Sequence, residues 1–124
     1  MKNWKEFIEA VTGDEVTSVA SVIQQGIDIN KQDKNGWSAL HYAVNFGYYN
    51  LAQDLVKNGA SIDVQDTFGN TPLWRAVFNF RDDGKIITLL LKHGANKDLK
   101  NKSGVSPAEL AHSIANYPVA KYFA

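Results

Sequence analysis

The sequence predicts an all-α solenoid of about four stacked helix-turn-helix units joined by hairpin-like loops. The first observation is a Gly-x-Thr-Pro-Leu motif that begins at Gly69, with looser copies that begin at Gly36 and Gly104. The second is their spacing, because Gly36 and Gly69 are 33 residues apart and Gly69 and Gly104 are 35 apart. The third is helical periodicity between the motifs. A recurring unit of this length indicates repeats that bury a continuous core by stacking.

The 124 residues are expected to form a single domain, in which residues 1–32 make an N-terminal capping unit. A helix is predicted over residues 3–12 from apolar residues at i, i+3, i+4 and i+7, which are Trp4, Phe7, Ile8 and Val11. A second helix is predicted from Val16, Val19, Ala20 and Ile23, ending at Gly26. The Thr-Pro-Leu motif is missing here, as befits a terminal repeat that presents one face to water.

Residues 33–65 form the first complete repeat. Gly36 is expected at the tip of the hairpin turn, and the first helix, with Leu40 and Ala43, should end at Gly47. The apolar face of the second helix consists of Leu51, Ala52, Leu55 and Val56. Gly59 should close this second helix.

Residues 66–100 form a second repeat with a two-residue insertion. Asn70 or Thr71 can cap its first helix, and Pro72 suits the first turn, where a missing N–H has no consequence. The two extra residues fall within the loop Phe80–Gly84. The run Ile86–Leu91 then predicts the most apolar helix of the chain.

Residues 101–124 form a shorter C-terminal capping repeat. Ser106, Pro107 and Ala108 replace Thr-Pro-Leu, and a short final helix should begin at Pro118. Since one helix pair cannot bury its own apolar face, at least three such units are needed for stability. Strand content should be very small.

These motifs, together with the sequence Leu40-His41-Tyr42-Ala43, make the chain resemble an ankyrin repeat protein over nearly its whole length. It looks most like the small, stand-alone members found in bacteria. The resemblance implies a module that binds other proteins and has no catalytic activity. It also implies that His41, at the motif histidine, hydrogen-bonds the neighbouring loop.

Composition argues against several other functions. Thirteen basic residues balance thirteen acidic ones, whereas nucleic-acid binders usually show a basic excess. The chain has no cysteine, which excludes disulfides and thiolate metal sites. Charges near the N-terminus replace the apolar core of a signal peptide, and no stretch approaches the roughly 18 apolar residues of a membrane span. We therefore expect a cytoplasmic protein without cofactors, metals, nucleic acid or membrane contacts.

No catalytic or ligand-binding motif emerges from the residues. None of His41, His93 and His112 stands in a pattern with a serine or cysteine nucleophile. The acidic stretch that begins at Asp28 lacks the glycine and glutamate of an EF-hand calcium loop. Similar acids recur at Asp63 and Asp66, which favours a structural role in the hairpin turns. Glycine-rich nucleotide-binding loops are missing too.

The resemblance implies that partners contact the hairpin tips and the exposed face of the first helices. The tip positions of the two complete repeats are Lys34, Asn35, Trp37, Thr67, Phe68 and Asn70, and those of the last hairpin are Lys102, Ser103 and Val105. The first-helix positions are Tyr42, Asn45, Phe46, Arg75, Phe78 and Asn79. The enlarged loop adds Arg81, Asp82 and Asp83, because insertions in a regular array tend to lie on a binding surface.

The aromatic residues in this set carry two interpretations. Exposed aromatics on one face indicate interface anchors, and we favour this for Trp37 and Phe68. The alternative is that such rings pack against neighbouring repeats or fill gaps, which is equally compatible with Phe46 and Phe78. Trp74 replaces the motif histidine in its repeat, which favours a packing role there.

Two hypotheses for function follow. In the first, the chain is a monomer that binds another protein through its hairpin tips and concave face; a sharper version makes it an immunity protein that neutralises a bacterial toxin. In the second, it is a self-associating scaffold that uses the Ile86–Leu91 run and exposed aromatics. Balanced overall charge argues against the sharper version, because such inhibitors often carry a charge opposite to that of their target.

Overall fold

The computed structural model describes residues 3–80, 84–114 and 118–123. Within these ranges the chain forms seven α-helices and one 3-10 helix, without strands, which confirms the predicted all-α class. In chain order the helices are α1 (Trp4–Thr12), α2 (Val19–Gln24), α3 (Ala39–Phe46), α4 (Tyr49–Lys57), α5 (Pro72–Phe78), α6 (Lys85–Lys92), α7 (Pro107–Ser113) and η1 (Pro118–Phe123).

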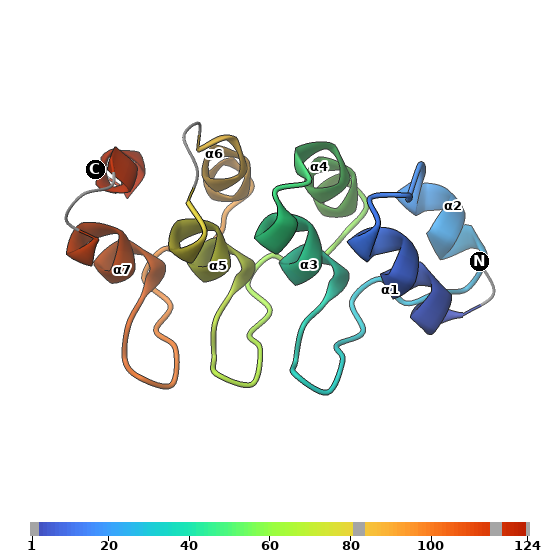
Figure 1. The fold of residues 1–124 in the computed structure, drawn as a ribbon, viewed down its shortest axis with the longest axis horizontal. Coiled ribbons are helices and arrows are strands. Elements are labelled where there is room, and N and C mark those ends of the chain that lie inside the picture. The colour runs from blue at the N-terminus through green and yellow to red at the C-terminus, as the bar shows by residue number, and fades with distance from the viewer. Residues whose placement is uncertain (1–2, 81–83, 115–117, 124) are drawn as a thin grey trace.

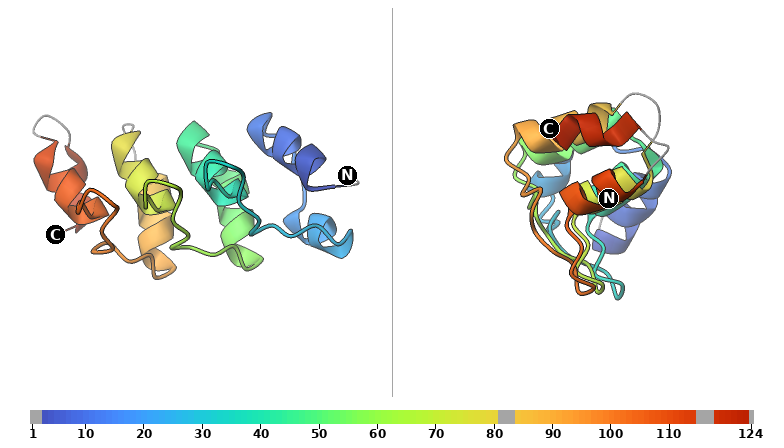
Figure 2. Two further views of the ribbon diagram at one scale, coloured as in Figure 1. Left: turned by 90° about the horizontal axis from the view of Figure 1, so that it is seen from below. Right: turned by 90° about the vertical axis from the view of Figure 1, so that its left-hand side faces the viewer.

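The helices form two layers, as Figure 1 shows. One row contains α1, α3, α5 and α7, whose neighbours pack against each other, and the second contains α2, α4, α6 and η1. The loops between successive pairs project to the same side as long hairpins (Figure 2). The first row and the hairpins therefore form one continuous face.

The first helix of each of the last three pairs begins with the same N-cap geometry. The side-chain oxygens of Ser38, Thr71 and Ser106 accept hydrogen bonds from the backbone N–H three residues later. Of the two caps expected for α5, the structure therefore uses Thr71. Pro72 is the first residue of that helix, as predicted.

The N-terminal pair departs from the sequence prediction in α2. This helix starts at Val19, after Ser18 as its cap, so Val16 lies outside it. The backbone N–H of Val19 donates to the Oδ2 atom of Asp54 in α4, at 2.9 Å. Ile23, expected on the apolar face, is 40% exposed. Ile23 lies within the helix, and Ala20 is exposed too, so the side of α2 that faces the core is the one with Val19 and Val22.

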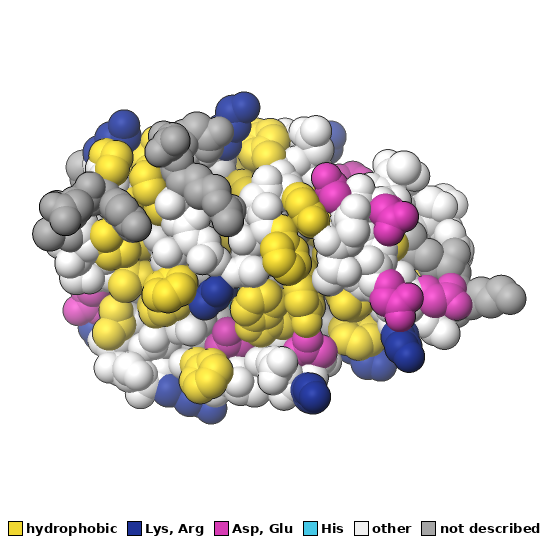
Figure 3. Space-filling view, viewed as in Figure 1, with side chains coloured by type: hydrophobic (Ala, Val, Ile, Leu, Met, Phe, Trp, Pro, Cys, Tyr) yellow, Lys and Arg dark blue, Asp and Glu magenta, His cyan; other side chains and the backbone are white. Residues whose placement is uncertain are grey.

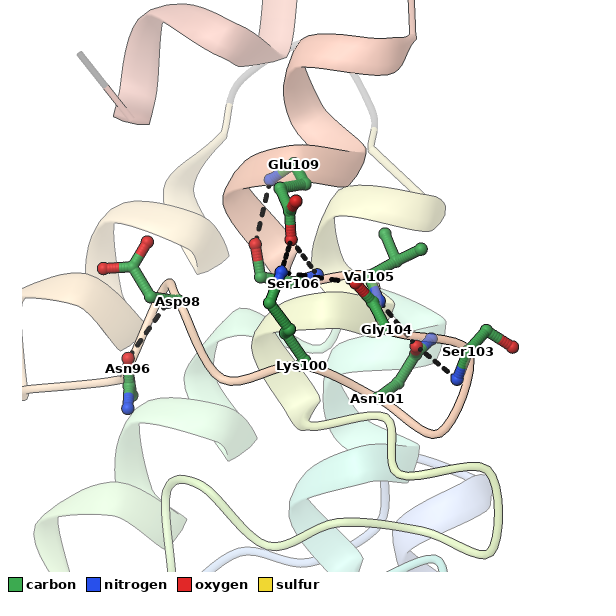
Figure 4. A network of polar contacts seen from close by, with 9 residues as sticks. All are labelled: Asn96, Asp98, Lys100, Asn101, Ser103, Gly104, Val105, Ser106 and Glu109. Carbon is green, nitrogen blue, oxygen red and sulfur yellow. Dashed lines mark hydrogen bonds and ion pairs between the residues drawn. The ribbon is translucent and has the colours of Figure 1, made fainter.

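Acidic and amide side chains hold the hairpin turns, as the recurrence of the acids predicted. The Oδ1 atom of Asp66 accepts from the backbone N–H groups of Phe68 and Asn70, both at 2.9 Å. Asp33 makes the equivalent pair of bonds, and Asn101 does so in the last hairpin. Figure 4 shows that last hairpin.

Close to the Asn101 hairpin, Lys100 and Glu109 form an ion pair at 2.7 Å. Glu109 also belongs to the capping box of α7, in which it accepts from the backbone N–H of Ser106 (Figure 4). The hydrogen bond from Lys100, followed by the bonds to Ser106, holds the pKa of Glu109 down at about 2. The carboxylate is therefore charged at neutral pH, when it accepts both bonds.

Adjacent hairpins are joined by backbone hydrogen bonds. The N–H of Thr67 donates to the carbonyl of Asn35 at 3.1 Å, and the N–H of Lys102 donates to the carbonyl of Phe68 at 3.0 Å. These bonds require close approach of the backbones at Gly36 and Gly69. A Cβ atom on Gly36 would lie 2.6 Å from the nitrogen of Thr67.

The apolar core runs between the two helix rows along the array. The Ile86–Leu91 run contributes Ile87, Leu89 and Leu90 to it, and the flanking Ile86 and Leu91 are half-buried. These side chains are therefore used inside the fold, which removes the run as a ready dimer surface. None of the described helices has both the length and the apolarity needed to cross a membrane.

Candidate functional site

Exposed aromatic side chains concentrate on the face made by α3, α5 and the hairpins. We call the aromatic patch the set Trp37, Tyr42, Phe46, Trp74 and Phe78. Phe46 is 44% exposed and Phe78 is 52% exposed, while Phe68 at the neighbouring hairpin tip reaches 70%. Figure 3 shows hydrophobic side chains gathered over α3 and α5 on this face. Large exposed rings of this kind on one face are unusual for a surface without a partner.

The rings of the aromatic patch stack along each helix. Tyr42 and Phe46 have ring centroids 6.4 Å apart, and Trp74 and Phe78 have centroids 5.4 Å apart, at angles of 25° and 14°. Both pairs are four residues apart on a helix, so they lie on the same side. The sequence predicted a packing role for Trp74, and its ring packs on that of Phe78, where it extends the exposed aromatic surface. The four-residue spacing of Trp74 and Phe78 is the sequence feature that indicates this contact.

Trp37 lies between two repeats and is only half-buried. Its indole Nε1 donates to the Oδ2 atom of Asp66 at 3.2 Å. Its ring stacks on His41 with centroids 5.9 Å apart and meets the edge of Tyr42. The fold itself therefore uses Trp37, so its substitution would test stability as well as binding.

Tyr42 is tied to the first hairpin. Its hydroxyl donates a short hydrogen bond to the Oδ2 atom of Asp33. Burial, and then this hydrogen bond, raise the pKa of Tyr42 to about 12. The phenol therefore stays protonated and continues to donate at neutral pH.

A polar cluster crosses the aromatic patch from α3 to α5. The Nη2 atom of Arg75 donates to the Oδ1 atom of Asn45 at 2.9 Å, and the Nδ2 atom of Asn79 donates to the same oxygen. The guanidinium carbon of Arg75 lies 5.3 Å from the centre of the Trp37 ring and 5.0 Å from that of Phe78. Burial lowers the pKa of Arg75, against the opposing effect of the Asp66 charge.

The remaining expected contact residues differ in accessibility. Lys34, Asn35, Thr67, Lys102 and Ser103 are exposed at the hairpin tips, and Val105 is half-buried. Asn70 is only 7% exposed, and its Oδ1 atom accepts from Asn101 at 2.8 Å, so its side chain belongs to the stacking of the hairpins. Arg81, Asp82 and Asp83 lie outside the described residues.

His41 is fully buried beneath Trp37 and links two repeats. Its Nδ1 atom accepts from the backbone N–H of Ser38 at 3.2 Å, which requires that Nδ1 carry no proton. The Nε2–H therefore donates to the carbonyl of Asn70, at 2.9 Å. This confirms the loop-bonding role implied by the family resemblance. Burial is the main cause of a lowered pKa for His41.

The lowered pKa of His41 predicts a pH-dependent stability. Below the unfolded pKa of about 6.5, the unfolded chain binds a proton at this site before the folded chain does. The free energy of unfolding should therefore fall as pH drops from about 6.5 towards the lower folded pKa, by at most about 1.4 kcal/mol per pH unit. Urea titrations at several pH values between 7.5 and 5 would measure this.

The control for this prediction is His41→Gln, which keeps His93 and His112. The difference between wild type and His41→Gln should shrink as the pH falls. A constant difference across the range would contradict the assigned protonation.

A hollow lies on the other helix row, between α4 and α6. It has a volume of about 370 Å³ and is lined by Tyr49, Gln53, Lys85, Thr88, Leu89, Lys92 and His93. These side chains form no arrangement of nucleophile and base. In the part of the chain that the structure describes, no group of three or more His, Cys, Asp or Glu side chains could hold a metal ion.

Comparison with known proteins agrees with this architecture. A sequence family described as ankyrin repeats in three copies matches residues 7–123. Human SH3 and multiple ankyrin repeat domains protein 2 is 27% identical over 113 residues, which are 91% of this chain and 6% of that protein. An ankyrin repeat-containing protein of Schizosaccharomyces pombe is 30% identical over 102 residues, 81% of this chain and 47% of its own length.

The B-cell lymphoma 3 protein homolog of Mus musculus is 33% identical over 102 residues, 82% of this chain and 22% of that protein. This chain therefore spans less than half the length of each of these three relatives. Putative ankyrin repeat proteins of the bacteria Rickettsia felis and Rickettsia bellii are similar too, at 36% and 33% identity. The relatives are therefore diverse, and the narrower resemblance to small stand-alone bacterial members stays a prediction.

Proposed function

The chain belongs to the ankyrin repeat family, and we propose that it binds a partner protein through the aromatic patch and the adjoining hairpin tips. Ankyrin repeats generally serve as protein-binding modules. The observation that carries the proposal is the exposure of Phe46, Phe68 and Phe78 on the face that the first helices and hairpins share.

Physical considerations support this surface over others. Burial of exposed aromatic rings removes a large apolar area from water, at about 25 cal/mol per Å². The rings of Phe46 and Phe78 are already held by stacking on Tyr42 and Trp74, so little side-chain freedom remains to be lost on binding. Pre-organised aromatic residues are the usual hot spots of protein interfaces.

The test is affinity capture from the source cells, followed by titration of the captured and then purified partner. The pair Phe46→Ser/Phe78→Ser should weaken binding at least about tenfold, because each anchor typically contributes more than 1 kcal/mol. The matched control is Ile23→Ser, which removes an exposed apolar side chain from α2, in the other helix row. Equal affinity of wild type and the phenylalanine pair would contradict the proposal.

The same affinity capture also shows which class of protein the partner belongs to. The immunity hypothesis requires a toxin domain among the captured proteins. Neither the balanced charge nor the relatives favour a toxin over other partners. Sedimentation at several protein concentrations addresses the self-associating scaffold, since a partner-binding monomer should keep one sedimentation coefficient.

A further inference from the structure

Arg75 occupies an unusual position for a surface cation. It lies within the aromatic patch, with its guanidinium 5.3 Å from the ring centre of Trp37 and 5.0 Å from that of Phe78. The two rings come from different repeats. This contact with two aromatic rings holds the long side chain in place, so its remaining N–H donors have a defined direction.

No described carboxylate pairs with this guanidinium within ion-pair distance. Its Nη2 atom donates to Asn45, and its Nε atom is buried without a hydrogen-bond acceptor among the described residues. A partly buried cation with an unsatisfied donor is destabilising in the free protein. A partner cannot reach the buried Nε, but the Nη1 group is not fully buried and also has no acceptor among the described residues. An anion bound at Nη1 would offset part of the cost of the partly buried charge.

The side-chain amides of Asn45 and Asn79, next to Arg75, are oriented so that they leave further donors without an acceptor. Because arginine can only donate, Asn45 must turn its Oδ1 atom towards Arg75. Asn79 shares that oxygen and must therefore present its Nδ2 atom. The Oδ1 atom of Asn45 is thus used by two internal donors, and its own Nδ2 donates to no described residue. The centre of the patch offers more donors than acceptors.

The nearby acids limit the charge of the anion. Asp66 accepts two backbone hydrogen bonds and one from Trp37, and Asp33 accepts two backbone bonds and one from Tyr42. Internal donors thus occupy both carboxylates, but their charges remain beside the patch. The charges of Asp33 and Asp66 would repel a doubly charged phosphate about twice as strongly as a singly charged carboxylate. A single carboxylate flanked by apolar groups therefore suits a single guanidinium that is surrounded by aromatic rings.

We infer that the partner presents an Asp or Glu side chain flanked by apolar residues, and that Arg75 binds this carboxylate while Phe46 and Phe78 bind the flanks. This inference rests on the proposed function of the aromatic patch. It adds the chemistry of the recognised segment, which is an acidic residue within an apolar stretch of polypeptide. Arg75 and the amide of Asn45 supply the hydrogen bonds to the carboxylate.

The experiment is selection from a random 12-residue peptide library displayed on phage, with immobilised wild type as bait. Peptides that bind through the patch are those that bind wild type but no longer bind the variant Phe46→Ser/Phe78→Ser. Among them we expect Asp or Glu at one recurrent position with apolar neighbours. Selection on Arg75→Gln, which keeps a polar side chain without the charge, should abolish the acidic preference while apolar residues remain enriched.

A synthetic peptide from the wild-type selection gives the quantitative test. Changing its acidic residue to the amide should weaken binding to wild type at least about tenfold, as expected for a charge-assisted hydrogen bond. The same change should have less than about a threefold effect on Arg75→Gln. The measurement on wild type needs no protein variant, so it stands even where Arg75→Gln is less stable.

Failure of this inference and failure of the proposed function give different results. The carboxylate inference would be overturned if the patch-dependent peptides showed no preference for Asp or Glu. It would also be overturned if that preference were still seen in the selection on Arg75→Gln. In both cases protein binding by the patch would still stand. Selected peptides that all bind Phe46→Ser/Phe78→Ser as well as wild type, or no selected peptide, would overturn both.

Discussion

Gly36→Ala should lower the free energy of unfolding by about 3 kcal/mol, the largest expected effect of removing a single glycine constraint. Gly36 has a φ of +76°, where an alanine is strained by about 1 kcal/mol or more. The new Cβ would also lie 2.6 Å from the nitrogen of Thr67 and 2.8 Å from the Cα of Asp66. Since these are backbone atoms, the two hairpins must separate, and the bond from Thr67 to Asn35 would be lost.

Gly104→Ala is the matched control, because Gly104 holds the equivalent position in the last hairpin. Its φ is +79°, and an added Cβ would meet no atom within 4 Å. It should lower stability by only about 1 kcal/mol, the backbone effect without the clash. Urea unfolding of both variants measures the difference. Equal losses would mean that hairpin stacking contributes little to the stability of the array.

His41→Ala is expected to lower the free energy of unfolding by about 3 kcal/mol. The substitution leaves a cavity in a fully buried site and removes the hydrogen-bond partners of the Ser38 N–H and the Asn70 carbonyl. Trp37 would lose its stacking contact as well. The bond to Asn70 joins one repeat to the next, so its loss should weaken the interface between them.

His93→Ala provides the comparison for His41→Ala. His93 is exposed at the C-terminal end of α6, and the hydrogen bond of its ring Nδ1 atom is to the carbonyl of Leu89 in that helix. Its removal should change stability by no more than about 0.5 kcal/mol. Thermal unfolding of both variants at pH 7.5 is sufficient, and similar midpoints would contradict the structural role assigned to His41.

Local features of the fold were well predicted from the sequence. The turn at Gly36, the end of α3 at Gly47 and the cap of α5, for which Thr71 was one of two candidates, depend on backbone conformation within a few residues. Such features follow from residue type and spacing. The start of α2 was predicted less well, because Val16 continued the apolar pattern beyond the helix that Ser18 caps.

The candidate site was predicted in outline but not in detail. Phe46, Phe68 and Phe78 were included among the expected contacts, and the structure shows their rings exposed. Asn70 was included too, but its side chain serves the hairpin stack. The role of Trp37 depends on Asp66, which is 29 residues away in the sequence, and repeat spacing alone does not reveal that contact.

The sequence by itself determined the helix class, the repeat length, the glycines at the turns and the family to which the chain belongs. These follow from local conformation and from the apolar periodicity that makes each unit need its neighbours. Only the tertiary structure decided which aromatic rings stay exposed and that Arg75 lies between Trp37 and Phe78. The physical reason is that both depend on contacts across adjacent repeats, where the neighbouring helix and hairpin set the space and the partners of each side chain.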